Sequence, residues 1–116
     1  MNHTELLKGT IGTIILKLLE EKGRMYGYEI VQLVKEMSDE KILVKEGSLY
    51  PALHKLEADK LLVSEEVFIG KRVRKYYSLT PAGKISAKAS VDELLAFIQT
   101  IHQLITPELS KPYATA

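Results

Sequence analysis

Two runs of strand-forming residues, separated by only two residues, place the strongest constraint on the fold of this chain. Leu62 to Ile69 and Arg72 to Leu79 are rich in β-branched and aromatic residues, and Gly70-Lys71 between them has the length of a tight turn. This pattern predicts a two-stranded β-hairpin. Most of the remaining chain has helical periodicity, so the predicted fold class is mainly α with a small β-hairpin.

The stretch before the hairpin, Gly47 to Glu57, predicts a short helix that starts at an N-cap residue, Ser48, and runs to about Lys60. Leu49, Leu53 and Leu56 lie on one buried stripe. The opposite face carries Ser48, Tyr50, Pro51, His54 and Lys55. Small, aromatic and hydrogen-bonding side chains with one cation suit the reading of base edges and phosphates. Taken alone, the pattern fits a helix that only covers a core equally well.

The charge of the chain is unevenly distributed, although its formal net charge is only +1. Residues 69–84 contain five basic residues and no acidic one: Lys71, Arg72, Arg74, Lys75 and Lys84. A localised basic patch on a neutral domain is typical of a protein that binds a polyanion, and a solvated turn is the alternative. Because the basic hairpin directly follows the helix with the polar and aromatic face, we favour nucleic-acid binding.

The other elements complete a winged helix-turn-helix. We predict a first helix from Thr4 to about Glu21, a second from Tyr26 to Met37, a short strand at Ile42 to Val44, and a last helix from the Thr80-Pro81 cap to about Ile105. Three helices followed by a hairpin place the third helix in the major groove of DNA and the hairpin on the flanking backbone or minor groove. The domains expected are a DNA-binding domain (1–79), a dimerisation helix (80–106) and a loose tail (107–116).

Composition excludes several classes of function. The chain has 116 residues, enough for one domain, and it contains no Cys, which excludes a disulfide scaffold and a thiolate metal site. The three His residues are far apart, and there is neither a Gly-rich phosphate loop nor a Ser–His–Asp order, so we expect no metal, no cofactor and no enzyme. No apolar run has the length of a membrane span, and the first residues lack an export signal. A cytoplasmic protein is expected.

The last helix carries a heptad pattern that predicts a homodimer. Val91, Leu94, Ile98, Ile101 and Ile105 recur at spacings of three and four. We expect this seam to pair with the first helix of the partner subunit as well as its own. A hydrophobic effector would then use the space between subunits, lined by Leu7, Ile11 and Ile15 from the first helix and by Leu94, Phe97 and Ile98 from the last. A plain interface without an effector is the alternative.

Several segments resemble the PadR-like family of bacterial transcriptional regulators, in the family's order. They are Leu6 to Thr10, Met25 to Ile30, Gly47 to Glu57 and Gly70 to Gly83. The resemblance implies a homodimeric repressor of detoxification, efflux or stress genes, with a C-terminal dimerisation helix. It also implies hydrophobic or phenolic effectors. Two-fold pairing would set two recognition helices about one DNA turn apart, which predicts a pseudo-palindromic operator. The single C-terminal helix resembles the smaller size class of the family.

The resemblance also assigns roles by position. DNA contacts fall on Tyr28 in the second helix, on Ser48, Tyr50, Pro51, His54 and Lys55 in the third, and on Lys71, Arg72, Arg74 and Lys75 in the hairpin. The chain departs from the family in a shorter hairpin with an apolar outgoing strand (Val67-Phe68-Ile69), and in having no Trp for an effector pocket. The alternative function is a winged helix used only as a protein–protein interaction module. The basic, acid-free hairpin favours DNA, because the cores of protein interfaces are depleted in Lys.

Overall fold

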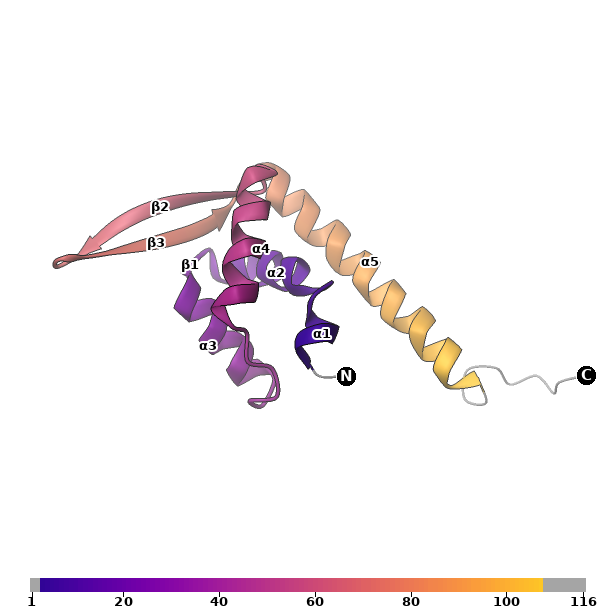
Figure 1. Cartoon of the computed structure of the whole chain (residues 1–116). Coiled ribbons are helices and arrows are strands. Elements are labelled where there is room, and N and C mark those ends of the chain that lie inside the picture. Colours follow the sequence, from indigo (N-terminus) through magenta and orange to yellow (C-terminus); the bar gives the residue numbers. More distant parts are fainter. Residues whose placement is uncertain (1–2, 108–116) are drawn as a thin grey trace, which may run out of the picture.

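The computed structural model describes residues 3–107, which contain five helices and three strands (Figure 1). In chain order they are α1 (His3–Leu7), α2 (Ile11–Lys22), β1 (Arg24–Tyr26), α3 (Gly27–Met37), α4 (Glu46–Ala58), β2 (Leu62–Ile69), β3 (Arg72–Leu79) and α5 (Pro81–Ile105). The predicted fold class, mainly α with a small antiparallel sheet, is confirmed. Apart from Pro107, the predicted loose tail lies outside the described residues.

The hydrophobic core lies where α2, α3 and α4 meet the base of the hairpin. Its largest fully buried side chains are Ile15, Leu19, Ile30, Leu49, Leu53, Leu62 and Tyr77. The stripe predicted for α4 is confirmed, because Leu49 and Leu53 are fully buried and Leu56 packs against them half-buried. In α3, Ile30 and Val34 are buried, whereas Met37 at the end of the helix is exposed.

The hairpin has the predicted bounds and a third strand that was not predicted. β2 and β3 pair antiparallel from Leu62↔Leu79 to Ile69↔Arg72. β1 pairs with the other edge of β3, from Arg24↔Ser78 to Tyr26↔Tyr76, which gives the strand order β1-β3-β2. The strand predicted at residues 42–44 was wrong. That run is irregular, and its Val44 side chain instead fills the core.

The predicted continuous first helix is broken into α1 and α2 at residues 8–10. The backbone N–H and the side-chain hydroxyl of Thr10 both donate to the Leu7 carbonyl, at 2.8 and 3.0 Å, and close the end of α1. The Thr10 carbonyl then accepts from Ile14 N–H at 3.0 Å and starts α2. Gly9 between them is a poor helix former, which favours the break. Thr4 lies inside α1 and is not the N-cap that the sequence suggested.

α4 starts three residues earlier than predicted. Lys45 is its N-cap residue, so Ser48 is the third helical residue and does not cap the helix. Pro51 is therefore inside the helix, where its missing N–H leaves the Gly47 carbonyl without its usual partner. The helix ends at Ala58, where Leu61 N–H donates to the Leu56 carbonyl at 3.0 Å over a left-handed Lys60 (φ 63°). This closing pattern is a Schellman motif.

α5 begins at a joint that ties it to the end of α4. As predicted, Thr80 caps the helix: its Oγ1 accepts from Gly83 N–H at 3.0 Å and donates to the Lys60 carbonyl at 2.8 Å. The Thr80 N–H also donates to the Leu61 carbonyl at 3.0 Å. Gly83 passes so close to Leu61 that an added Cβ would lie 2.0 Å from its carbonyl oxygen. The start of α5 is thus fixed on the rest of the domain by contacts of Thr80 and Gly83 with the backbone of Lys60 and Leu61.

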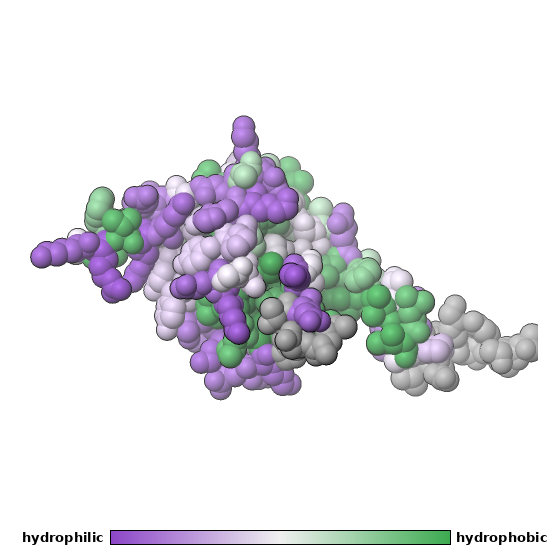
Figure 2. Space-filling model, in the orientation of Figure 1, coloured by the Kyte–Doolittle hydropathy of each residue, from purple (hydrophilic) through white to green (hydrophobic). Residues whose placement is uncertain are grey.

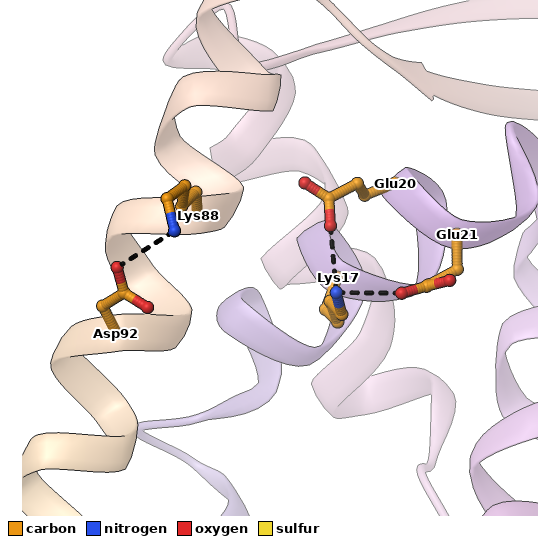
Figure 3. Close-up of polar contacts among 5 residues, drawn as sticks. All are labelled: Lys17, Glu20, Glu21, Lys88 and Asp92. Carbon is orange, nitrogen blue, oxygen red and sulfur yellow. Dashed lines mark hydrogen bonds and ion pairs between the residues drawn. The ribbon is translucent and has the colours of Figure 1, made fainter.

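The first half of α5 packs along α2, and the second half extends beyond the domain (Figure 1). Ala87 is fully buried, and Val91 and Leu94 are half-buried. Figure 3 shows charged pairs on both helices: Lys17 lies 3.0 Å from Glu20 and 2.9 Å from Glu21, and Lys88 lies 3.6 Å from Asp92. The hydrogen bond between Lys17 and Glu21 raises the pKa of Lys17 and lowers that of Glu21. Each of these pairs lies within one helix, whereas the contact between α2 and α5 includes the apolar side chains Ile14, Leu18, Val91 and Leu94.

Candidate nucleic-acid interface

The outer face of α4 presents the predicted side chains to solvent. Tyr50, Pro51, His54 and Lys55 are exposed, and Ser48 is half-buried. The Tyr50 and His54 rings lie one helical turn apart, with centroids separated by 6.4 Å. The face therefore combines a hydroxyl, an imidazole and one cation on a rigid helix, which suits hydrogen bonding to base edges.

The start of α3 sets the position of Tyr50, a relationship that the sequence did not indicate. Gly27 is buried against the Tyr50 side chain, and a Cβ at Gly27 would lie 2.6 Å from the phenolic oxygen. The backbone N–H of Tyr26 donates to Glu29 Oε1 at 3.1 Å, which closes the first turn of α3. Tyr28 is exposed in this turn and lines a groove together with Tyr50 and His54, so this predicted contact residue lies next to the α4 face.

A groove of about 710 Å³ separates the hairpin from α3 and α4. Its lining joins the start of α3, the α4 face and the returning strand of the hairpin: Tyr26, Gly27, Tyr28, Tyr50, His54, Ile69, Arg72, Val73, Arg74, Lys75 and Tyr77. The structure thus brings together the predicted residues from three separate segments of the chain. Three of the predicted hairpin cations (Arg72, Arg74 and Lys75) line this groove, and Lys71 is exposed at the turn.

A ladder of aromatic rings and guanidinium groups holds Arg74 in place. The Arg74 guanidinium lies 4.0 Å from the centre of the Tyr26 ring. The Tyr26 and Tyr76 rings are nearly perpendicular, with centroids 5.4 Å apart. Arg24 covers the Tyr76 ring at 4.3 Å and pairs with Glu65 at 2.7 Å. A hydrogen bond to Tyr76 raises the pKa of Arg74, which therefore keeps its charge. These contacts fix the base of the hairpin, and no pattern in the sequence indicated them.

Glu57 connects the hairpin to α4 from the other side. The Ser64 hydroxyl donates to Glu57 Oε2 at 2.5 Å, and Lys75 Nζ lies 3.8 Å from Glu57 Oε1. Lys75 is therefore partly neutralised midway along the hairpin, whereas Lys71 and Arg72 lie exposed at its tip. Two exposed cations thus lie at the projecting end of the hairpin, in a position suited to contacts with phosphates.

The residues predicted for an effector site do not come together within one chain. Ile15 is fully buried in the domain core and lines no surface. Leu7 and Ile11 line a groove of about 420 Å³ between α1, α2 and α4, which also includes Ser48, Pro51 and Lys55. The groove between α2 and α5, of about 240 Å³, instead uses Thr13, Ile14, Lys17, Leu18, Met37, Val91, Leu94 and Leu95. The α2 face that meets α5 thus includes Ile14 and Leu18.

The second half of α5 exposes a row of large apolar side chains. Of the predicted seam, Val91 and Leu94 are half-buried against α2, while Ile98, Ile101 and Ile105 are exposed. The other exposed apolar side chains of this half are Leu95, Phe97 and Leu104. Contiguous exposed apolar surface of this kind is typical of an interaction site.

Comparisons with known proteins agree with this architecture. A model of the transcriptional regulator PadR-like family matches residues 15–89. A transcriptional regulator of known structure from Clostridium thermocellum is 33% identical, with a TM-score of 0.78 over 85% of this chain and 96% of that one. The structure of Bacillus subtilis PadR in complex with operator DNA is 30% identical, with a TM-score of 0.64, over 71% of this chain and 46% of that one.

The similarity to a curated relative is higher but shorter. The transcriptional regulator Rv3488 of Mycobacterium tuberculosis is 50% identical over 52 residues, which are 45% of this chain and 49% of that protein. The match therefore spans about half the length of this relative. In the described part of the chain, no helix is both long and apolar enough to cross a membrane.

Proposed function

Because this chain belongs to the PadR-like family of transcriptional regulators, we propose that it binds double-stranded DNA sequence-specifically through α4 and the hairpin. One observation carries the proposal: the exposed α4 face and the basic strand β3 line the same groove. With α4 in the major groove, Tyr50 and His54 face base edges, and Lys71 and Arg72 reach phosphates on the flanking backbone. The complex of Bacillus subtilis PadR with operator DNA supports the same partner for this fold.

The functional unit we propose is a homodimer formed through α5. The exposed apolar row that includes Ile98, Ile101 and Ile105 supports this, because within residues 3–107 no other element covers it. A second copy of α5, together with α1 and α2 of that copy, would bury it. A two-fold axis between the copies places two α4 helices about one DNA turn apart, and the operator is then a pseudo-palindrome. Binding at such an operator would make the protein a repressor.

A hydrophobic or phenolic effector would use the space between the two subunits. The lining we propose comes from Leu94, Phe97 and Ile98 of α5 and from the α1–α2 surface of the partner copy, where Leu7 and Ile11 border a groove. Titration with flat aromatic compounds, followed by NMR, tests this: shifts on α5 are expected. Shifts confined to the hairpin would contradict this site.

The DNA-binding proposal is tested by sequencing the genomic DNA fragments that the purified protein retains from its own genome. We expect enrichment of a short pseudo-palindrome whose neighbouring genes identify the regulon. The control is the Tyr50→Ala variant, which keeps the hairpin charges and should retain fragments without that enrichment. If the wild-type protein also retains DNA without enrichment, the proposed reading by α4 is wrong. If it retains no DNA, the winged helix serves as a protein-interaction module instead.

A further inference from the structure

The far end of the hairpin carries an exposed apolar pair. The Phe68 side chain is 74% exposed and that of Val73, its register partner across the two strands, is 52% exposed. Figure 2 shows a hydrophobic patch among hydrophilic atoms at the projecting end of the hairpin. Strand propensity alone does not require these residues, since Thr would satisfy it with a polar surface. A partner outside the domain would explain the pair.

The alternation of the strands places this pair on the hairpin face that looks toward α4. Ser64↔Tyr77, Glu66↔Lys75 and Phe68↔Val73 are successive pairs on one face. The first two pairs identify the face, because Ser64 and Lys75 both contact Glu57 of α4. At about 3.3 Å per residue, Val73 lies about 13 Å farther out than Tyr77. The apolar pair therefore lies on the hairpin face that looks toward α4, farther out than the Glu57 contacts, and Val73 borders the groove that Tyr50 and His54 also line.

The surroundings of the pair identify the kind of partner. Lys71 in the turn and Arg72 at the start of β3 lie next to it, and Lys75 is the next residue inward on its face. The two carboxylates nearest to the apolar pair along β2 are each matched by a basic residue. Glu66 lies opposite Lys75, and Glu65, on the other face, pairs with Arg24 at 2.7 Å. An apolar tip flanked by cations is complementary to a groove with phosphates on both sides and stacked bases between them.

We propose that Phe68 and Val73 form a minor-groove wedge, an inference that rests on the proposed DNA binding. With α4 in the major groove, Lys71 and Arg72 contact the phosphates on the sides of the next minor groove, and Phe68 enters it and partly unstacks one base step. Apolar wedges of this kind kink the duplex toward the major groove. Pyrimidine–purine steps unstack most easily, so the wedge adds a preference for such a step outside the bases that α4 reads.

The experiment uses 2-aminopurine, whose fluorescence rises when it unstacks, at each pyrimidine–purine step that flanks the half-sites. The probe is the duplex most enriched in the fragment-sequencing experiment. Binding of the wild-type protein should raise the fluorescence at one flanking step on each side. Phe68→Ala should abolish this rise and weaken binding about 5- to 100-fold. Its salt dependence should be unchanged, because no charge is lost. Phe68→Leu should keep part of the fluorescence rise and part of the affinity.

Val63→Ala is the matched control, since Val63 is also 52% exposed on β2 but lies on the opposite face at the base of the hairpin. It should bind and unstack the probe like the wild-type protein. If the wild-type protein binds the probe without a fluorescence rise, or Phe68→Ala binds it unchanged, the wedge is wrong while the proposed function stands. If the wild-type protein binds no duplex, the proposed function fails first. Phe68-dependent binding to phosphatidylglycerol vesicles, with DNA affinity unchanged, would also overturn the wedge.

Discussion

Replacing Gly83 with Ala should destabilise the joint between α5 and the DNA-facing domain. The new Cβ would lie 2.0 Å from the carbonyl oxygen of Leu61, and both atoms belong to the backbone, so no side-chain rotation can relieve the overlap. A carbon and a carbonyl oxygen in close contact are about 3.3 Å apart, so the start of α5 must move by about 1.3 Å. Three hydrogen bonds of Thr80, to Gly83, Lys60 and Leu61, are centred on this point.

The magnitude follows from these contacts. Each hydrogen bond contributes about 1 kcal/mol net, and the N-cap bond of Thr80 is one of them. The helix propensity of Ala returns up to about 1 kcal/mol relative to Gly. We therefore expect Gly83→Ala to lower the free energy of unfolding by about 2–3 kcal/mol and the Tm by roughly 10 °C at a fixed protein concentration.

Gly12→Ala is the matched control, because its nearest neighbour, Leu56 Cδ2, would be 4.0 Å from the new Cβ. The two variants change the unfolded chain equally, so their difference reports the folded state. Thermal and urea unfolding, followed by circular dichroism, should show Gly12→Ala unchanged or stabilised by up to about 1 kcal/mol. Equal stability of the two variants would refute the close contact between α5 and Leu61.

Three further changes probe other parts of the molecule. Gly27→Ala should displace the half-exposed Tyr50 ring and cost roughly 1–3 kcal/mol of binding to the enriched duplex but little on random DNA, as measured by fluorescence anisotropy. Ile98→Asp should place an unpaired charge in the proposed dimer seam, at a cost of several kcal/mol, and give monomers in sedimentation. Burial raises the pKa of the Tyr77 phenol above its value in the unfolded chain. The stability that the buried, protonated phenol contributes is therefore complete below about pH 10 and is lost as the pH rises through the folded-state pKa. Tyr77→Phe should therefore lose less stability than the wild-type protein between neutral and alkaline pH in urea unfolding.

Each of these expectations has a clear contrary result. If Gly27→Ala prefers the enriched duplex over random DNA as strongly as the wild-type protein does, Tyr50 does not contribute to base recognition. Wild-type protein that sediments as a monomer at micromolar concentration would remove the dimer and the palindrome together. Parallel loss of stability in Tyr77→Phe and wild-type protein above pH 10 would show that another group titrates.

The elements with a strong local pattern were predictable from sequence. The bounds of β2 and β3 follow from two alternating runs around Gly70-Lys71, and the start of α5 follows from Thr80-Pro81. β1 was missed because three residues carry no measurable periodicity, and its strand geometry depends on the free edge of β3. The start of α4 was misplaced because Ser48 is a good N-cap residue by type, while the helix that forms begins at Glu46 after an extended Lys45.

The candidate site, too, was predictable only in part. The exposed α4 face and the basic strand were predictable because they depend on helical periodicity and on charge. The roles of Gly27 and Tyr26 were not predictable. Gly27 is required by the close approach of the Tyr50 side chain, and Tyr26 acts through its stacking with Arg74. Such contacts between segments that are distant in sequence leave no local pattern.

The shared use of α4 and the hairpin is tested most directly by the salt dependence of DNA affinity. Wild-type protein, the Lys71→Ala/Arg72→Ala double variant and His54→Ala are each titrated with the enriched duplex and a scrambled one, from low to physiological salt. The double variant should bind both duplexes more weakly by a similar factor, and its slope of log affinity against log salt should flatten by about two, roughly one for each lost phosphate contact. His54→Ala should lose affinity only for the enriched duplex. A double variant with the affinity and slope of the wild-type protein would contradict a DNA-binding surface that includes the hairpin.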